Sequence, residues 1–435
     1  MNRDVLSHRT LLLAAFGLFL LLPAEMSLGH PAWTNGWHLN CPLQAGSNAE
    51  LVCKIQVLST RRAEIIKKYL PGGKADPSRM LARSKVLSVI KGECKPAIDI
   101  EFDDQRSRTA GFSPSGRGTE LTKGEVCIVF LKHQEGRYVL NRIRSKLRVR
   151  PEVVDYNLGD TPNLRLLAEM LAGCDSKNEM VQLQAVEELG YLSKAMFREL
   201  RPFKGDRELF EKMAFGLIRT KEALQRMRRS ENQMIRGMSI ISSFWADDSP
   251  GIEGPLELLR MNPSDFDKDD SLRKYGTWGF CVSDLQLRLL ETMDSATRRA
   301  VVDLKDGSVI RREDGNLGMY RGVRGFDYAE FYRQALDCDA VRKNEQMRGA
   351  IANVIWIRYE KRSVPLMVQL LDDSNLYVRF VAVGSLMKYT GEGPKRSSWE
   401  EFGERNQKYV EYWKGWWSKN KARFRAPQKM NHGID

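Results

Sequence analysis

The stretch SVPLMVQLLDDSNLYVRFVAVGSLMKYT, residues 363–390, decides the fold of the longer part of the chain. It holds two apolar runs of helical spacing on either side of the polar turn DDSN, residues 372–375. Spacings of three and four put one apolar stripe on each run, which predicts two antiparallel helices. The residues expected to face inward are Leu366, Leu370, Val378, Ala382 and Leu386.

Related second helices recur upstream, so this hairpin is a repeated unit. They lie at residues 180–192, 233–244 and 346–357. Helix pairs of this size cannot bury their apolar faces alone and have to stack on one another. We therefore expect an α-α superhelical solenoid over residues 155–397, with an extended surface that binds a partner.

These units resemble the HEAT repeats of armadillo-type proteins. Pro-Leu opens the first helix, Asp lies in the turn, and the second helix reads Val-Arg-x-x-Ala-x-x-x-Leu. The resemblance extends over roughly residues 160–395. It implies that Asp373 and Arg379 make structural contacts between turns and helices, with no chemical role.

Residues 48–150 alternate with a period of two, which is typical of strands. Candidate strands lie at residues 51–58, 84–90, 98–102, 126–131 and 138–140, with Lys-Gly-Glu turns at Gly92 and Gly124. Five short strands with turn signals between them predict a small closed β-barrel. The expected fold class is thus α+β multidomain, a small OB-like barrel followed by the solenoid.

This order of segments resembles the OB-type barrel of the tissue inhibitors of metalloproteinases and of netrin modules, in the version found in exported bacterial proteins. The matching stretches are AELVCKIQVL, VLSVIKGE and LTKGEVCIVFL with GRYVL. In the inhibitors an N-terminal Cys-x-Cys chelates the protease zinc through the free α-amine. This sequence offers only Cys41 in that region, so the inhibitory mechanism is not carried over.

The chain has seven cysteines and no Cys-x-x-Cys pair, which disfavours a zinc ribbon or a thioredoxin-type site. Because an OB-like barrel pairs its first and fourth strands, the resemblance implies a Cys53–Cys127 disulfide, with Cys41–Cys94 as the second candidate. The alternative is two buried thiols inside the barrel. The odd count leaves at least one thiol unpaired, which we expect in a helix as a small hydrophobe.

The first 29 residues have the layout of a secretory signal peptide. Basic residues precede the apolar run from Leu11 to Leu22, and Ser27 and Gly29 are small residues at the −3 and −1 positions of a cleavage site. The run is short for a bilayer core of about 30 Å, which favours cleavage near Gly29 over an uncleaved anchor. We expect an exported protein, periplasmic or secreted, with residues 30–47 as a linker.

A formal net charge of +13 favours anionic partners. Export disfavours nucleic acid, which leaves a protein in the cell envelope or outside the cell, an anionic polymer or a lipid surface. One local pattern is a candidate anion-binding strip, because alternate residues of an extended strand share a face. The strip consists of Arg142, Arg144, Lys146, Arg148 and Arg150. The alternative is that these charges protect an edge strand from unwanted pairing.

Residues 398–435 combine aromatic residues at helical spacing with a basic tail. Tyr409, Trp413, Trp416 and Trp417 share one side of a helix. Because the end of a solenoid needs a closing element, we interpret this segment as a Trp-rich capping helix. The alternative is a basic aromatic helix on a membrane surface.

The sequence lacks HExxH, GxSxG, GxxxxGK and a Rossmann fingerprint, which disfavours the enzymes that carry these signatures. We therefore expect no enzyme, no cofactor and no metal, but an exported, non-enzymatic binding or scaffold protein that recognises another protein or an anionic envelope component. The alternative is a protease-inhibitor-like or regulatory barrel on a solenoid scaffold. A third hypothesis is a divergent hydrolase.

Overall fold

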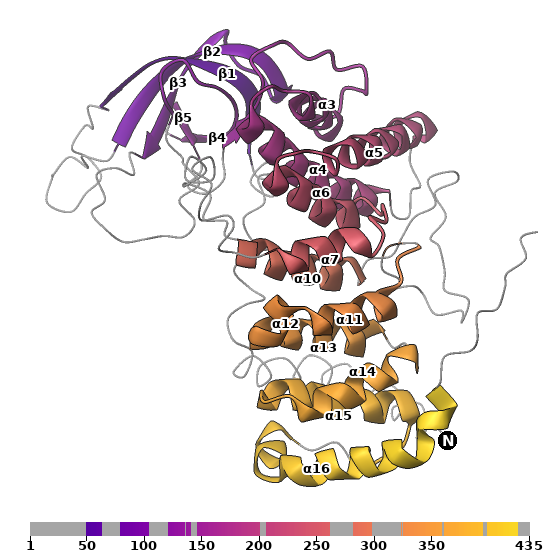
Figure 1. The fold of residues 1–435 in the computed structure, drawn as a ribbon. Helices are drawn as coiled ribbons and strands as arrows, with labels where there is room; N and C mark the ends of the chain where they lie inside the picture. Colours follow the sequence, from indigo (N-terminus) through magenta and orange to yellow (C-terminus); the bar gives the residue numbers. More distant parts are fainter. Residues whose placement is uncertain are drawn as a thin grey trace, which may run out of the picture.

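The computed structural model consists of a β-barrel followed by a stack of helices (Figure 1), which confirms the expected α+β class. The barrel lies at one end of the stack and the last long helix lies at the other. The structure describes residues 49–62, 79–103, 121–134, 136–140, 146–200, 206–261, 282–297, 323, 325–358, 361–394 and 398–424. The predicted signal peptide and linker lie outside these residues.

The strands form one sheet that closes on itself. They are β1 (Leu51–Arg62), β2 (Arg79–Lys91), β3 (Ala97–Asp103), β4 (Val126–Gln134), β5 (Arg137–Leu140) and β6 (Lys146–Arg148). The strands are hydrogen-bonded in the order β1-β2-β3-β5-β4. Of these four pairs, β3–β5 is parallel and the others are antiparallel. Antiparallel pairing of β1 with β4 closes the five strands, as expected, and β6 adds to β4.

Both faces of β1 are buried along its first half. Leu51, Cys53 and Ile55 belong to the barrel interior, whereas Val52 belongs to the core that the helices share. Side chains of successive residues in a strand point to opposite faces, so one face of β1 lines the barrel and the other faces the helices. The barrel therefore covers the first end of the helical stack.

The predicted Lys-Gly-Glu turns require glycine. Gly92 has φ +80°, and a Cβ atom there would lie 2.5 Å from the carbonyl oxygen of Glu50. Gly124 has φ +85°. Residues with a side chain rarely adopt positive φ, so these two glycines let the strands on either side of each turn lie as they do.

The expected Cys53–Cys127 disulfide is wrong, and the alternative of two buried thiols is confirmed. Cys53 lies opposite Val129 and Cys127 lies opposite Ile55, so the two cysteines are diagonal neighbours rather than a direct pair. Diagonal positions on antiparallel strands are about 7–8 Å apart, beyond the reach of a normal disulfide. Both are buried free thiols, and Cys94, the expected partner of Cys41, is also a free thiol. Cys41 itself lies outside the described residues.

The helices follow one another in antiparallel layers (Figure 1). They are α3 (Pro162–Cys174), α4 (Glu179–Glu199), α5 (Arg207–Met227), α6 (Gln233–Trp245), α7 (Glu253–Arg260), α10 (Val282–Thr297), α11 (Tyr328–Asp337), α12 (Asp339–Lys343), α13 (Glu345–Arg358), α14 (Val364–Gln369), α15 (Leu376–Thr390) and α16 (Trp399–Asn420). Short 3₁₀ turns are η3 (Lys361–Ser363), η4 (Leu370–Asp372) and η5 (Lys421–Phe424). Helices α4, α6, α10, α13, α15 and α16 contact one another in that order, so the second helix of each pair stacks on the next.

Four of the second helices begin with an asparagine cap. In each case the side-chain oxygen accepts hydrogen bonds of 2.9–3.4 Å from the backbone N–H groups two and three residues later. The caps are Asn178, Asn232, Asn344 and Asn375. Such a cap satisfies N–H groups that a helix leaves without a partner, which fixes where each helix starts.

Three of these caps are followed, four residues later, by an arginine that joins one helix pair to the next. We call these arginines, Arg236, Arg348 and Arg379, the arginine ties. Each guanidinium donates to the backbone carbonyl six residues before it and also to a side chain of the following pair. The joined side chains are Arg236 and Glu257 at 3.1 Å, Arg348 and Asp373 at 2.6 Å, and Arg379 and Asn406 at 3.3 Å. The structural contacts expected for Asp373 and Arg379 are thus present.

Helix α16 covers the far end of the stack. It contacts α15 and buries Phe402, Tyr409, Trp413 and Trp416. The aromatic face predicted for this helix is therefore turned toward the protein. Among the described residues, no helix is both long and apolar enough to cross a membrane.

A buried polar network joins the barrel to the first helix pair. The Lys54 ammonium on β1 lies 2.9 Å from the carboxylate of Glu169 on α3, and the two side chains are 1% and 0% exposed. Lys54 also donates to the carbonyl of Glu152 at 2.7 Å, and the hydroxyl of Tyr156 donates to Glu169 at 2.9 Å. The Tyr156 hydroxyl also lies 2.8 Å from that of Ser88 on β2. Paired in this way, the two charges tolerate burial at the junction.

Candidate binding cleft

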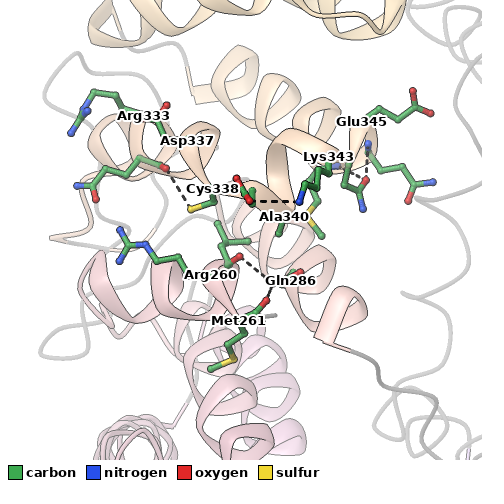
Figure 2. A pocket seen from close by; sticks show the side chains of 15 residues that line it. Arg260, Met261, Gln286, Arg333, Asp337, Cys338, Ala340, Lys343 and Glu345 are labelled. Carbon is green, nitrogen blue, oxygen red and sulfur yellow. Dashed lines mark hydrogen bonds and ion pairs between the residues drawn. The ribbon is translucent and has the colours of Figure 1, made fainter. Parts of the chain in front are cut away.

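A cleft of about 1260 Å³ opens between α7 and α10 on one side and α11, α12 and α13 on the other (Figure 2). The helix that begins at Tyr328 is interrupted beside the cleft. Cys338 has the extended backbone angles φ −71° and ψ 136°, so α11 ends before it and the short helix α12 follows. The two sides of the cleft still touch, because α10 contacts α13 and α7 contacts α11 and α12.

Gln286 fixes the floor of the cleft. It is 1% exposed, and its side-chain amide donates to the backbone carbonyls of Leu258, Leu259 and Met261 at 3.0, 3.1 and 3.0 Å. The last carbonyls of a helix have no partner within it, so this amide satisfies the end of α7. The bond network holds α7 against α10 and makes this wall of the cleft rigid.

Cys338 is the one thiol in the part of the cleft lining that the structure describes. Its side chain donates to the backbone carbonyl of Gln334 at 3.6 Å, and it lies near Arg260 (Figure 2). Burial raises the pKa of the Cys338 thiol, and the positive charge of Arg260 offsets only part of this effect. The thiol is therefore protonated at neutral pH, whereas a cysteine nucleophile has to be a thiolate.

Charges of both signs surround the opening. Arg260, Arg333 and Asp337 lie toward one end, and Lys343 and Glu345 lie toward the other (Figure 2). All five are exposed. Each cation is held by an acid of its own helix: Arg260 contacts Glu253 at 3.5 Å, Arg333 contacts Glu330 at 2.6 Å, and Lys343 contacts Asp339 at 3.6 Å. Hydrogen bonds from Arg333 lower the pKa of Glu330 to about 2, so this carboxylate stays ionised near neutral pH.

The described lining holds one thiol beside several amides and charges. It contains no histidine beside the thiol, and the described residues hold no group of side chains that could ligate a metal ion. A catalytic cysteine needs an adjacent base or a lowered pKa of its thiol. The lining instead offers amides, charges and a few apolar side chains, which are groups that recognise a ligand.

The predicted anion-binding strip lies away from this cleft, on and beside β6. Lys146 contacts Glu125 at 2.8 Å, and Arg148 lies 4.0 Å from the same carboxylate. Arg150 lies 3.8 Å from Glu152. The residues between them, Leu147 and Val149, are buried, so the predicted alternation is present. Arg142 and Arg144 lie outside the described residues.

A second, much smaller cavity of about 30 Å³ lies between α4, α6 and α10. Arg288 crosses it and donates to Glu187 at 2.8 Å and to the hydroxyl of Tyr191 at 3.0 Å. A space of this size holds about one water molecule. We therefore assign it to helix packing.

None of the cleft residues was singled out from the sequence. The cleft lies beside a helix break and is lined by five helices, and apolar periodicity reveals neither feature. One signal was present: Gln286 is a polar residue between Leu285 and Leu289 on the buried side of a helix.

Comparison with known protein families finds no model that matches the chain. Comparison with curated proteins finds no similar sequence. The barrel and the helical stack are thus described by their architecture alone.

Proposed function

We propose that this chain is an exported, non-enzymatic binding and scaffold protein that recognises another protein or an anionic envelope component. The observation that carries the proposal is the large cleft whose wall is fixed by Gln286 and whose thiol at Cys338 is not activated. Such a site offers many contacts and, among its described residues, no activated thiol.

The proposed finer assignments are HEAT-like repeats for the helix pairs and an OB-type barrel. Asparagine caps and arginine ties at a constant spacing support the repeats. The closure of β1 on β4 supports the barrel. Stacked repeats generally expose a long surface to partners, and here the barrel and α16 cover the two ends and leave the sides open.

Export is the part of the proposal that rests on the N-terminal sequence. Intact-mass measurement of the chain recovered from the envelope or medium should give a mature protein that begins at His30. Recovery of a full-length chain from the cytoplasm would contradict export.

Binding is tested with the purified mature chain and a native envelope extract. Chemical cross-linking in about 50 mM salt should give a discrete, saturable complex with one component, and its loss in about 500 mM salt would show that charge contributes to binding. The same preparation is assayed with ester, peptide and glycoside substrates. Turnover that is lost in Cys338→Ser would overturn the proposal, because the thiol would then be catalytic.

A further inference from the structure

We infer that the cleft between α7 and α11–α13 takes a polypeptide segment of the partner, one that carries charges of both signs. This inference rests on the proposed binding function and selects a protein over an anionic polymer as the partner. It follows from the size, the lining and the charge of the cleft taken together.

The size and the described lining favour a ligand larger than the usual small molecule. The volume of about 1260 Å³ exceeds the range of about 300–1,000 Å³ that is common for small-molecule sites. None of the fifteen lining residues is aromatic. Nucleobases are generally held by stacking on aromatic side chains, and the described lining offers no such platform.

The charge of the rim disfavours a polyanion. Although the chain carries +13, the cations Arg260, Arg333 and Lys343 alternate here with acids. The acids are Asp337, Asp339 and Glu345. Complementary recognition requires opposite signs across the interface, and a polyanion would meet these three carboxylates. Arg260, Arg333 and Lys343 have acidic partners on their own helices, and a polypeptide with both signs can share these ion pairs without net repulsion.

The uncharged part of the lining also fits a polypeptide. Gln334, Gln346 and Asn344 bring side-chain amides, which both donate and accept hydrogen bonds. A peptide backbone presents one donor and one acceptor per residue. Met261 and Met347 add flexible apolar contacts that adjust to different side chains.

The test uses a library of random peptides displayed on phage, selected on the immobilised full chain. A selected peptide is synthesised, and its Kd is measured for the wild type and for the double variant Arg260→Glu/Arg333→Glu. We expect the Kd to rise about tenfold or more in this variant, because like charges then face the peptide. Dextran sulfate, a plain polyanion, should compete weakly.

The matched control is Arg207→Glu/Arg219→Glu on the outer face of α5. These arginines are 64% and 52% exposed, close to the 53% and 55% of Arg260 and Arg333. The control should bind the peptide as the wild type does. Equal loss in both variants, or selection of no peptide that depends on Arg260 and Arg333, would overturn the inference.

A second measurement needs no variant. In the wild type, a saturating peptide should slow the alkylation of Cys338 at least severalfold, because that thiol lines the cleft. Unchanged alkylation would place the peptide elsewhere and overturn the inference, while a binding protein would still be supported. Dextran sulfate that protects Cys338 better than any peptide would assign the cleft to a polyanion.

Discussion

Arg348 shows how one side chain can join two repeats. Its Nε and Nη2 atoms donate to the carboxylate of Asp373 at 2.6 and 3.1 Å, and the two side chains are 13% and 5% exposed. We expect Arg348→Ala to lower the free energy of unfolding by about 3 kcal/mol, because it leaves a buried carboxylate without its partner.

Urea denaturation followed by circular dichroism measures this loss. Arg342→Ala is the control, since Arg342 and its partner Asp339 are 62% and 67% exposed, and its cost should stay below about 1 kcal/mol. Equal costs for the two variants would contradict the role given to Arg348.

Cys338 gives a prediction about pH. Because burial raises its pKa, the thiolate fraction near pH 7.5 is smaller than for a free cysteine. Alkylation of Cys338 should therefore be slower than that of a model thiol and should accelerate toward alkaline pH. Arg260→Ala should slow it further, because the arginine charge favours the thiolate. Mass spectrometry of the alkylated peptide measures the rate, and a faster reaction than the model thiol at neutral pH would refute this account.

At the scale of the element, the asparagine caps set the register of the repeats. Asn375→Ala should lower the free energy of unfolding by about 1 kcal/mol, because the N–H groups of Tyr377 and Val378 lose their acceptor. Asn375→Ser keeps a capping oxygen and should stay close to the wild type. Thermal melts of the two variants separate capping from a general effect of substitution.

Two glycines should respond in opposite ways to alanine. A Cβ atom at Gly190 on α4 would lie 2.9 Å from Ser242 Oγ and 3.1 Å from its Cα on α6, so Gly190→Ala should cost about 1–3 kcal/mol. At Gly415 on α16 nothing lies within 4 Å, so Gly415→Ala should stabilise the helix by up to about 1 kcal/mol. A gain at Gly190 would show that α4 and α6 lie farther apart.

The sequence predicted elements better than it predicted contacts between them. Apolar periodicity located the strands and the helix pairs because it reports which faces are buried. It could not place Cys53 and Cys127, since a shift of two residues in register leaves the alternation unchanged. It also could not reveal that Lys54 is buried, because alternation assigns a lysine to solvent until a partner such as Glu169 is known. The cleft was not predicted either, because it depends on contacts between helices that apolar periodicity does not report.

At the scale of the whole molecule, the barrel and the stack share one core and one buried ion pair. Glu169→Leu alone and Lys54→Met alone should each cost about 3–5 kcal/mol, because each leaves an unpaired buried charge. The double variant removes both charges and should recover most of this loss.

Urea denaturation followed by tryptophan fluorescence and by circular dichroism tests the coupling. Coincident transitions in the wild type are expected if barrel and helices unfold together. If the double variant were as unstable as the single variants, the loss would not come from an unpaired buried charge at Lys54 or Glu169.

The constant spacing from asparagine cap to arginine tie has a consequence for how such a chain changes over evolutionary time. Any helix pair that keeps this spacing presents the same upper and lower surfaces to its neighbours. Duplication or loss of one pair would therefore alter the distance between the barrel and α16 by a fixed increment and leave both covers intact.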